Sequence, residues 1–282
     1  ADATPELLGS LGSGSDPEPK GLRLRTIRLE RSAGPAAARN RGWRAARAGT
    51  IAFTDDDCVP DPGWLEAGLL AAAESPGAIV QGQTIPSAEE WDRMGTVARA
   101  FTHAVEVREP DPHHQTCNVF YPRSVLERAE GFDEAVFARV EGEDADLAWR
   151  SIAAGTPTAF APEARVVHGR IPIGPGGKLR RAASWNLKVY ALHRGLRESW
   201  FTRRWFWLGR HYLLLRALVA AALPRRLLPV KVWLAAPYAA HLLERGRAEG
   251  GGPALAPYYA VADLLELGAA ARASVRYRVP ML

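Results

Sequence analysis

Cysteine is scarce in this chain, and acidic residues are scarce in its second half. The two cysteines, Cys58 and Cys117, form no disulfide framework, which argues against a small disulfide-stapled secreted domain and fits a reducing compartment. No segment combines a basic start, an apolar core and a small-residue cleavage site, so no secretory signal peptide is predicted. We therefore expect a cytoplasmic location.

Long apolar runs are also missing. Residues 212–223 are apolar except for Arg216, and residues 227–243 are apolar except for Lys231 and His241. Both runs are shorter than the roughly 20 residues that span a bilayer. Their arginine-rich flanks and aromatic residues instead predict helices that lie in a membrane interface and are attracted to anionic lipid. The alternative is that these helices pack on the rest of the chain, with the arginines solvating their outer faces.

The small net charge of +5 hides an uneven distribution. Residues 1–168 hold 17 basic and 26 acidic residues, a net charge of −9, whereas residues 169–282 hold 19 and 5, a net charge of +14. Such a division indicates two surfaces with different partners. The basic part has no recognisable nucleic-acid reading motif, and its arginines alternate with bulky apolar residues, so no nucleic-acid partner is predicted.

Strand and helix patterns alternate through the first part of the chain. Predicted strands cover residues 22–30, 50–54, 78–85, 115–121 and 158–168, with helices predicted over 35–48, 62–73, 87–107, 123–129 and 144–154. This alternation predicts an α/β sheet. From Gly174 onward the pattern is helical, with helices predicted over 177–197, 200–223, 227–245 and 255–275. We expect an α/β domain over residues 1–170 and a helical, basic region over 171–282.

Three consecutive aspartates, Asp55, Asp56 and Asp57, follow the predicted strand 50–54. Carboxylates at the end of a strand can face the crevice where α/β sheets bind ligands. Side chains two residues apart share one face of an extended segment, so Asp55 and Asp57 would point the same way. Such a pair suits Mg²⁺ or Mn²⁺, with phosphate oxygens as further ligands. The alternative is a solvated acidic turn.

A second group of acids opens the predicted helix 144–154. Glu143, Asp144 and Asp146 lie in its first turn, where the helix dipole stabilises negative charge, so capping alone could explain them. A group transfer, however, needs a carboxylate apart from the metal site, because one site holds a charged donor and the other takes a proton from the attacking hydroxyl.

Four segments together resemble the inverting glycosyltransferases of family 2, which have a GT-A fold. They are residues 34–42 (GPAAARNRG), the aspartates 55–57, residues 116–123 with the turn 130–134 (EGFDE), and residues 142–147 (GEDADL). The resemblance covers about residues 1–168. It implies a mixed, mostly parallel sheet flanked by helices, a nucleotide-sugar donor, a Mn²⁺ or Mg²⁺ ion, and transfer of a hexosyl-type sugar to a hydroxyl acceptor with inversion.

The resemblance also implies roles for single residues. Asp57 would bind the metal, Asp55 would contact the metal or the ribose, and His168 would be a further metal ligand or a structural histidine. Asp144 would be the general base that takes the proton of the acceptor hydroxyl. The remaining candidates would bind the donor or orient the acceptor. They are Arg39 for the diphosphate, Asn118 for the donor sugar or a strand end, Glu143 for the acceptor or a backbone amide, and Trp149 for an acceptor platform or the core.

One departure from the family leaves other functions open. Members usually begin with a strand, a helix and a second strand that ends in a DDGS-like motif, which this sequence does not contain. We expect the catalytic domain to be truncated at its N-terminus. The alternatives are a catalytically impaired membrane-associated scaffold of the same fold and a sugar-phosphate nucleotidylyltransferase. The basic helical part favours a glycan or lipid-linked acceptor of the cell envelope, and an enzyme bound peripherally to the inner face of the membrane.

Overall fold

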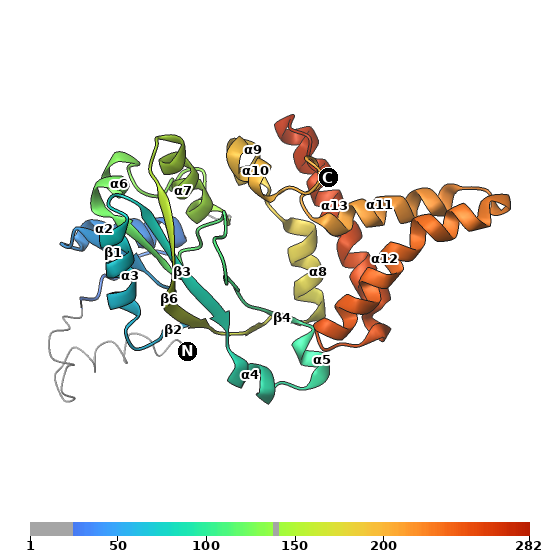
Figure 1. Ribbon diagram of the computed structural model, residues 1–282, viewed down its shortest axis with the longest axis horizontal. Coiled ribbons are helices and arrows are strands. Elements are labelled where there is room, and N and C mark those ends of the chain that lie inside the picture. Colours follow the sequence, from blue (N-terminus) through green and yellow to red (C-terminus); the bar gives the residue numbers. More distant parts are fainter. Residues whose placement is uncertain (1–24, 138–140) are drawn as a thin grey trace.

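The computed structural model describes residues 25–137 and 141–282. An α/β part lies on one side of the molecule and a helical part on the other, from which a helical hairpin projects away from the body (Figure 1). The predicted α/β architecture followed by a helical region is confirmed. The expected N-terminal truncation and residues 22–24 of the predicted strand lie outside the described residues. Residues 25–30 form no strand, because almost all of them are exposed and no face of the segment is buried.

Five strands form the central sheet in the order β1-β5-β3-β6-β2. Their bounds are Thr50–Phe53 (β1), Cys58–Pro60 (β2), Ile79–Pro86 (β3), Val119–Pro122 (β5) and Thr158–His168 (β6). The sheet is mixed, as expected, but not mostly parallel within the described residues. There β3 and β6 are parallel, whereas the β1–β5, β3–β5 and β2–β6 pairs are antiparallel. The sequence pattern did not reveal these directions, because the long segment 87–118, rather than a single crossover helix, joins β3 to β5.

Alternate residues of the central strands supply two cores on opposite faces of the sheet. Ile79 and Tyr121 pack in one core, while Val80 and Phe120 pack against Trp64 in the other. Since helices cover both faces of the sheet, the sequences of these central strands are largely apolar at successive positions rather than at alternate ones. The helices that cover them are α2 (Pro35–Ala45), α6 (Arg123–Arg128) and α7 (Glu143–Ala153) for the first core and α3 (Trp64–Glu74) for the second.

The segment between β3 and β5 is less helical than predicted. It contains two short helices, α4 (Ala88–Arg93) and α5 (Thr96–Arg99), and then β4 (Thr102–His103). β4 pairs with β7 (Ile171–Pro172) in a separate two-stranded sheet. This small sheet joins the α/β part to the first helix of the helical part.

The helical part contains more helices than the four predicted, because the predicted helix 177–197 breaks twice, after Ser184 and at His193, whose backbone is extended. The predicted helix 200–223 begins only at Gly209, after a tight turn in which Arg203 and Arg204 have positive φ. The helices are α8 (Gly174–Ser184), α9 (Lys188–Leu192), α10 (Arg194–Trp200), α11 (Gly209–Ala222), α12 (Leu228–Ala248) and α13 (Ala256–Tyr277), with 3₁₀ turns η1 (Arg225–Leu227) and η2 (Pro253–Leu255). Among the described residues, no helix combines the length and apolarity needed to cross a bilayer.

Candidate active site

The candidate residues meet at one edge of the central sheet. β1 ends at Phe53, two residues before Asp55, and pairs there with Val119, the first residue of β5. At the same edge, His168 at the end of β6 pairs with Cys58 at the start of β2. Because antiparallel neighbours bring the end of one strand beside the start of the next, residues distant in the sequence become neighbours here. This is the edge at which α/β sheets bind ligands.

Asp57, Cys58 and His168 form a group with metal-binding geometry, in which one ligand atom from each lies within 4.8 Å of the others. The His168 Nδ1 lies 2.6 Å from the carbonyl oxygen of Gly169, which places the proton on Nδ1 and leaves the lone pair of Nε2 free. That Nε2 lies 3.8 Å from Asp57 Oδ2. Two acceptor atoms at this distance are favourable neighbours when a cation lies between them, so the donor set fits a divalent ion.

The three predicted metal ligands therefore do not all lie in one group. Asp57 and His168 are brought together, whereas Asp55 forms an ion pair elsewhere. Asp56 is exposed. Cys58 was not predicted as a ligand; its position next to the aspartates was the only signal for it. Its thiol is also a neighbour of Cys117, and the hydrogen bond between the two, which outweighs burial, lowers the pKa of Cys58.

Arg39 connects the two acidic groups. Its guanidinium lies 2.8 Å from Asp55 Oδ1 and 2.6 Å from Glu143 Oε1, and its side chain is 19% exposed. The ion pairs tie helix α2 to the end of β1 and to the first turn of α7. Asp55 and Glu143 can therefore lie close to each other in a half-buried site without an uncompensated charge.

Asp144 lies in the first turn of α7, directly after Gly142 and Glu143. Gly142 has φ 114°, and a Cβ there would approach Val189 and Phe137 to 3.2 and 3.3 Å, so a side chain would strain this turn. The Ala145 N–H donates to Asp144 Oδ1 over 2.8 Å. Burial first, and then the charge of Glu143, raise the pKa of Asp144 to about 7. A carboxyl group with this pKa is suited to exchange a proton near neutral pH.

Asp146, by contrast, braces the helix. Its carboxylate pairs with Arg150 and His193, each at 2.8 Å. Burial alone would raise its pKa, but the hydrogen bonds from His193 and Arg150 outweigh burial and lower it. Two aspartates in one helical turn thus have opposite electrostatic environments.

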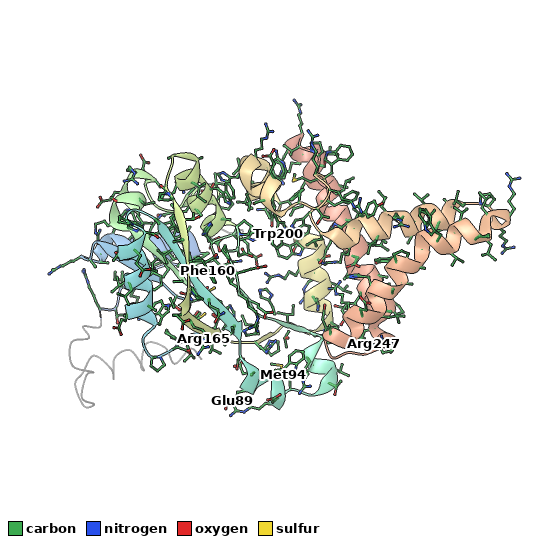
Figure 2. All side chains as sticks on the ribbon, in the orientation of Figure 1. Glu89, Met94, Phe160, Arg165, Trp200 and Arg247 are labelled. Carbon is green, nitrogen blue, oxygen red and sulfur yellow. The ribbon has the colours of Figure 1, made fainter. Side chains whose placement is uncertain are left out.

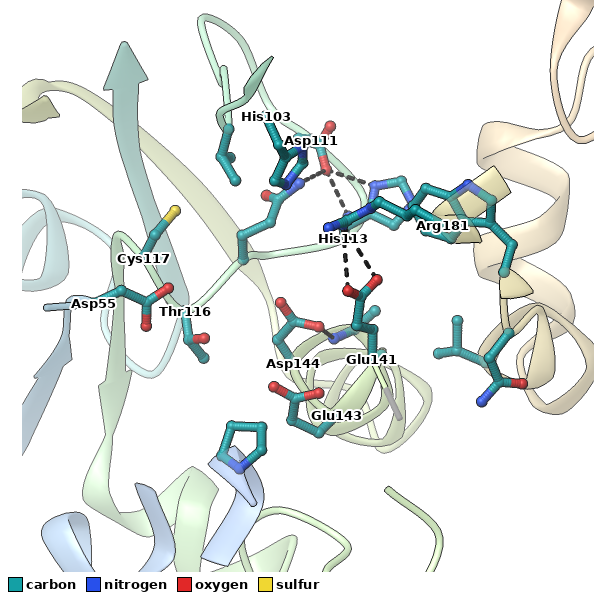
Figure 3. Close-up of a pocket in the computed structure, with 18 of the residues that line it drawn as sticks. Asp55, His103, Asp111, His113, Thr116, Cys117, Glu141, Glu143, Asp144 and Arg181 are labelled. Carbon is teal, nitrogen blue, oxygen red and sulfur yellow. Dashed lines mark hydrogen bonds and ion pairs between the residues drawn. The ribbon is translucent and has the colours of Figure 1, made fainter. Parts of the chain in front are cut away.

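A cavity of about 1290 Å³ opens between the α/β part and the helical part. Asp144 and Glu143 lie together on its floor, with Asp55 on one side and the Glu141–Arg181 pair on the other (Figure 3). Figure 2 shows Trp200 between the two parts of the molecule. The aromatic side chains that line the cavity all come from the helical part: Trp185, Tyr190, Trp200 and Trp207. The only sequence signal for them was that five of the nine tryptophans lie in the basic part, residues 169–282.

Two predicted site residues have structural contacts instead. Asn118 is 1% exposed, and its side-chain nitrogen donates to the carbonyls of Gln83 and Ala164, each over 2.7 Å, where β6 has a bulge against β3. Its side-chain oxygen accepts from Trp64 Nε1 over 2.8 Å. Trp149 donates to the carbonyl of Pro112 over 2.8 Å and is absent from the cavity lining. For both, the structure favours the packing interpretation that the sequence left open.

Comparisons with known proteins agree with the motifs. A sequence model of the family described as glycosyl transferase family 2 matches residues 1–129. A pre-mycofactocin glycosyltransferase of Mycobacterium tuberculosis is 33% identical over 146 residues, which cover 49% of this chain and 30% of that protein. The succinoglycan biosynthesis protein ExoO of Rhizobium meliloti is 30% identical over 185 residues, 60% of this chain and 49% of ExoO. The chain thus spans half or less of the length of these relatives.

A solved structure shares the fold. The mannosyltransferase PcManGT of Pyrobaculum calidifontis, in complex with GDP-Man and Mn²⁺, superposes with a TM-score of 0.50 at 18% identity, over 97% of this chain and 74% of that one. At this identity the likeness concerns the fold alone. Together with the family match over residues 1–129 and the four motifs, it confirms the predicted resemblance to glycosyl transferase family 2 and to its fold.

Proposed function

We propose that this protein transfers a sugar from a nucleotide-sugar donor to a hydroxyl group of an acceptor, with inversion at the sugar carbon. The observation that carries the proposal is the position of Asp144. It lies on the floor of a large cavity with a pKa raised to about 7, while a group suited to a divalent ion lies at the same edge of the sheet. A single displacement needs one such base and one means of stabilising the leaving diphosphate.

Asp57, His168 and Cys58 would hold the ion, Mn²⁺ or Mg²⁺. The carboxylate and imidazole suit Mn²⁺, whereas the thiol of Cys58 is a poor ligand for Mg²⁺, so Mn²⁺ fits this set better. When bound, the ion would supply positive charge to the leaving diphosphate. One protein of the same fold supports this assignment, since PcManGT was solved with GDP-Man and Mn²⁺.

Asp55 and Arg39 would contact the donor beside the ion. Both line the cavity. Arg39 has five N–H donors, so its two ion pairs leave donors free for a phosphate oxygen. Asp55 accepts from Arg39 through one oxygen, and its other oxygen is available to a ribose hydroxyl or to the ion. We leave Asn118 out of the donor site because its amide is used within the sheet.

Asp144 would accept the proton of the acceptor hydroxyl as that oxygen attacks the sugar carbon and the bond to the diphosphate breaks. Glu143 would hold Arg39 in place and keep the pKa of Asp144 high through its own charge. The aromatic wall of Trp185 and Trp200 would bind the acceptor in place of Trp149. Aromatic rings pack well on the apolar faces of sugars, which fits a glycan or a lipid-linked glycan.

We place this reaction in cell-envelope polysaccharide or glycolipid synthesis, on the cytoplasmic side of the membrane. The name of the relative ExoO, a succinoglycan biosynthesis protein, supports the pathway. The reduced cysteines support the compartment. The division of the chain into a catalytic domain, 1–170, and a basic helical region, 171–282, belongs to the same proposal.

The test is to incubate the protein with Mn²⁺, a panel of nucleotide sugars and glycan or glycolipid acceptors, and to follow release of the nucleoside diphosphate. The anomeric configuration of the product, read by NMR, should be opposite to that of the donor. A product with retained configuration would contradict the single-displacement mechanism. Release of a nucleoside monophosphate or pyrophosphate would favour a nucleotidylyltransferase, and no turnover with any donor would favour the impaired scaffold.

A further inference from the structure

Helices α11 and α12 form an antiparallel hairpin that projects from the helical part (Figure 1). Only its base is packed, where Leu214, Tyr238 and Leu242 form a small core with Tyr259 of α13. The hairpin is held together by its own contacts. Lys231 Nζ donates to the carbonyl of Leu223 over 2.7 Å and so caps the end of α11. It is therefore an element that keeps its shape without a partner.

Beyond the base, the hairpin exposes apolar side chains. The exposed large hydrophobic residues of the described chain are concentrated between residues 215 and 233, and Trp233 is 68% exposed and Leu228 61%. A cluster of this kind marks an interaction site in most soluble proteins. Its members are Leu215, Leu218, Val219, Leu227, Leu228, Val230, Val232 and Trp233.

The charge of the same segment identifies the partner. No acidic residue occurs between Glu198 and Glu244, while the interval contains seven basic residues, Arg203, Arg204, Arg210, Arg216, Arg225, Arg226 and Lys231. Arg225 and Arg226 lie at the end of the hairpin, are exposed, and make no ion pair within the described part of the chain. Exposed apolar residues mixed with unneutralised positive charge complement a surface that is apolar inside and negatively charged outside.

We propose that the α11–α12 hairpin is a docking element for the surface of a bilayer that contains anionic phospholipid. This inference rests on the proposed membrane setting of the enzyme and names the element responsible. The hairpin lies along the membrane interface. Its tip does not insert into the hydrocarbon core, because Arg225 and Arg226 at the tip would then leave the headgroup region. Trp233, with the guanidinium of Arg216 4.8 Å from its ring, sits where an interfacial aromatic residue is favoured.

Docking of the hairpin would also hold the cavity close to the membrane surface. Arg210, in the first turn of α11, lines the cavity and pairs with Asp263 over 2.8 Å and with Glu266 of α13. The base of the hairpin is thus part of the cavity wall. A lipid-linked acceptor in the same membrane would be held close to the entrance.

The experiment measures flotation of the full chain with two kinds of vesicle, one of phosphatidylcholine alone and one of phosphatidylcholine mixed with the anionic lipid phosphatidylglycerol. We expect binding to the anionic vesicles that falls as salt is added, and little binding to neutral ones. The double variant Arg225→Glu, Arg226→Glu should bind at least about 30-fold more weakly, since each basic residue near the surface is worth about 1 kcal/mol. Trp233→Ser should weaken binding to all vesicles.

The matched control is Arg47→Glu with Arg128→Glu, which changes the net charge equally at two exposed arginines of the α/β part. This variant should bind vesicles almost as well as the wild type. Equal losses in both double variants would overturn the proposal, as would absence of wild-type binding or equal binding to both vesicle types. A lipid-free dimer that the Trp233→Ser variant abolishes would assign the surface to a second copy instead. Donor binding in the hairpin variants, measured by calorimetry, separates a failure of docking from a failure of the proposed chemistry.

Discussion

Replacing Asp144 by asparagine should have two opposite effects, a loss of turnover and a gain in stability at alkaline pH. Burial and the neighbouring charge of Glu143 raise the pKa of Asp144 from its ordinary value of 3.8 to about 7. Asparagine keeps the shape of the side chain and can still accept the hydrogen bond from Ala145. It carries no charge, however, and cannot take a proton from an acceptor hydroxyl.

The size of both effects follows from this environment. A rise of the pKa from 3.8 to about 7 corresponds to roughly 4 kcal/mol that disfavours the charged form in the folded protein. Because the pKa of the folded state lies above that of the unfolded state, this cost is absent below about pH 4, where the carboxyl is protonated in both states, and grows until the pH has risen through 7, so stability is lost over that range. At pH 8 the variant should therefore be more stable by up to about 4 kcal/mol. Turnover should fall by about 10²- to 10⁴-fold, the usual contribution of a general base.

Urea unfolding at pH 5.5 and pH 8 measures the first effect, and release of nucleoside diphosphate measures the second. The advantage of Asp144→Asn should grow between the two pH values, and wild-type turnover should rise with pH through about 7. Asp146→Asn is the matched control. Its loss of the pairs with Arg150 and His193 should lower stability at both pH values. Turnover of Asp144→Asn within tenfold of the wild type, or an unchanged stability difference between the two pH values, would refute the assignment.

Three further substitutions test the rest of the site. His168→Ala should weaken Mn²⁺ binding at least about tenfold in a calorimetric titration, because it removes the free Nε2 that faces Asp57; unchanged affinity would place the ion elsewhere. Arg39→Ala leaves the buried carboxylate of Glu143 and the half-buried carboxylate of Asp55 unpaired, and should cost about 3 kcal/mol in the free energy of unfolding, measured by urea unfolding at neutral pH. Asn118→Ala removes three buried hydrogen bonds and should cost about 3 kcal/mol, measured by thermal or urea unfolding; a loss below about 0.5 kcal/mol would contradict its structural role.

The sequence predicted the local features well where a motif and an apolar pattern coincided. The strand before Asp55 and the helix that begins beside Asp144 are both present, since short apolar runs and an acidic first turn specify them locally. The strand predicted at residues 22–30 is not formed over its described part, because alternating basic residues gave a period of two without a buried face.

Contacts between segments that are distant in the chain could not be predicted from the sequence. Their spacing predicted that Asp55 and Asp57 share one face of an extended segment. In the structure Asp55 pairs with Arg39 of α2, whereas Asp57 lies beside His168 of β6. The positions of α2 and β6 therefore give the two aspartates different partners. Trp149 follows the candidate base closely but packs toward Pro112. The aromatic wall of the cavity comes from the helical part, where no periodicity indicated which rings would face the site.

The central claim, that this chain holds a nucleotide sugar through a divalent ion at the sheet edge, is tested most directly by calorimetry. Nucleotide sugars would be titrated into the wild type, Asp57→Ala and the control Asp56→Asn, each with and without Mn²⁺. Asp56 is exposed next to the metal group and is absent from it, so its variant should bind as the wild type does. We expect donor binding that requires Mn²⁺ and is lost in Asp57→Ala alone. Binding that is independent of Mn²⁺, or that survives in Asp57→Ala, would contradict it.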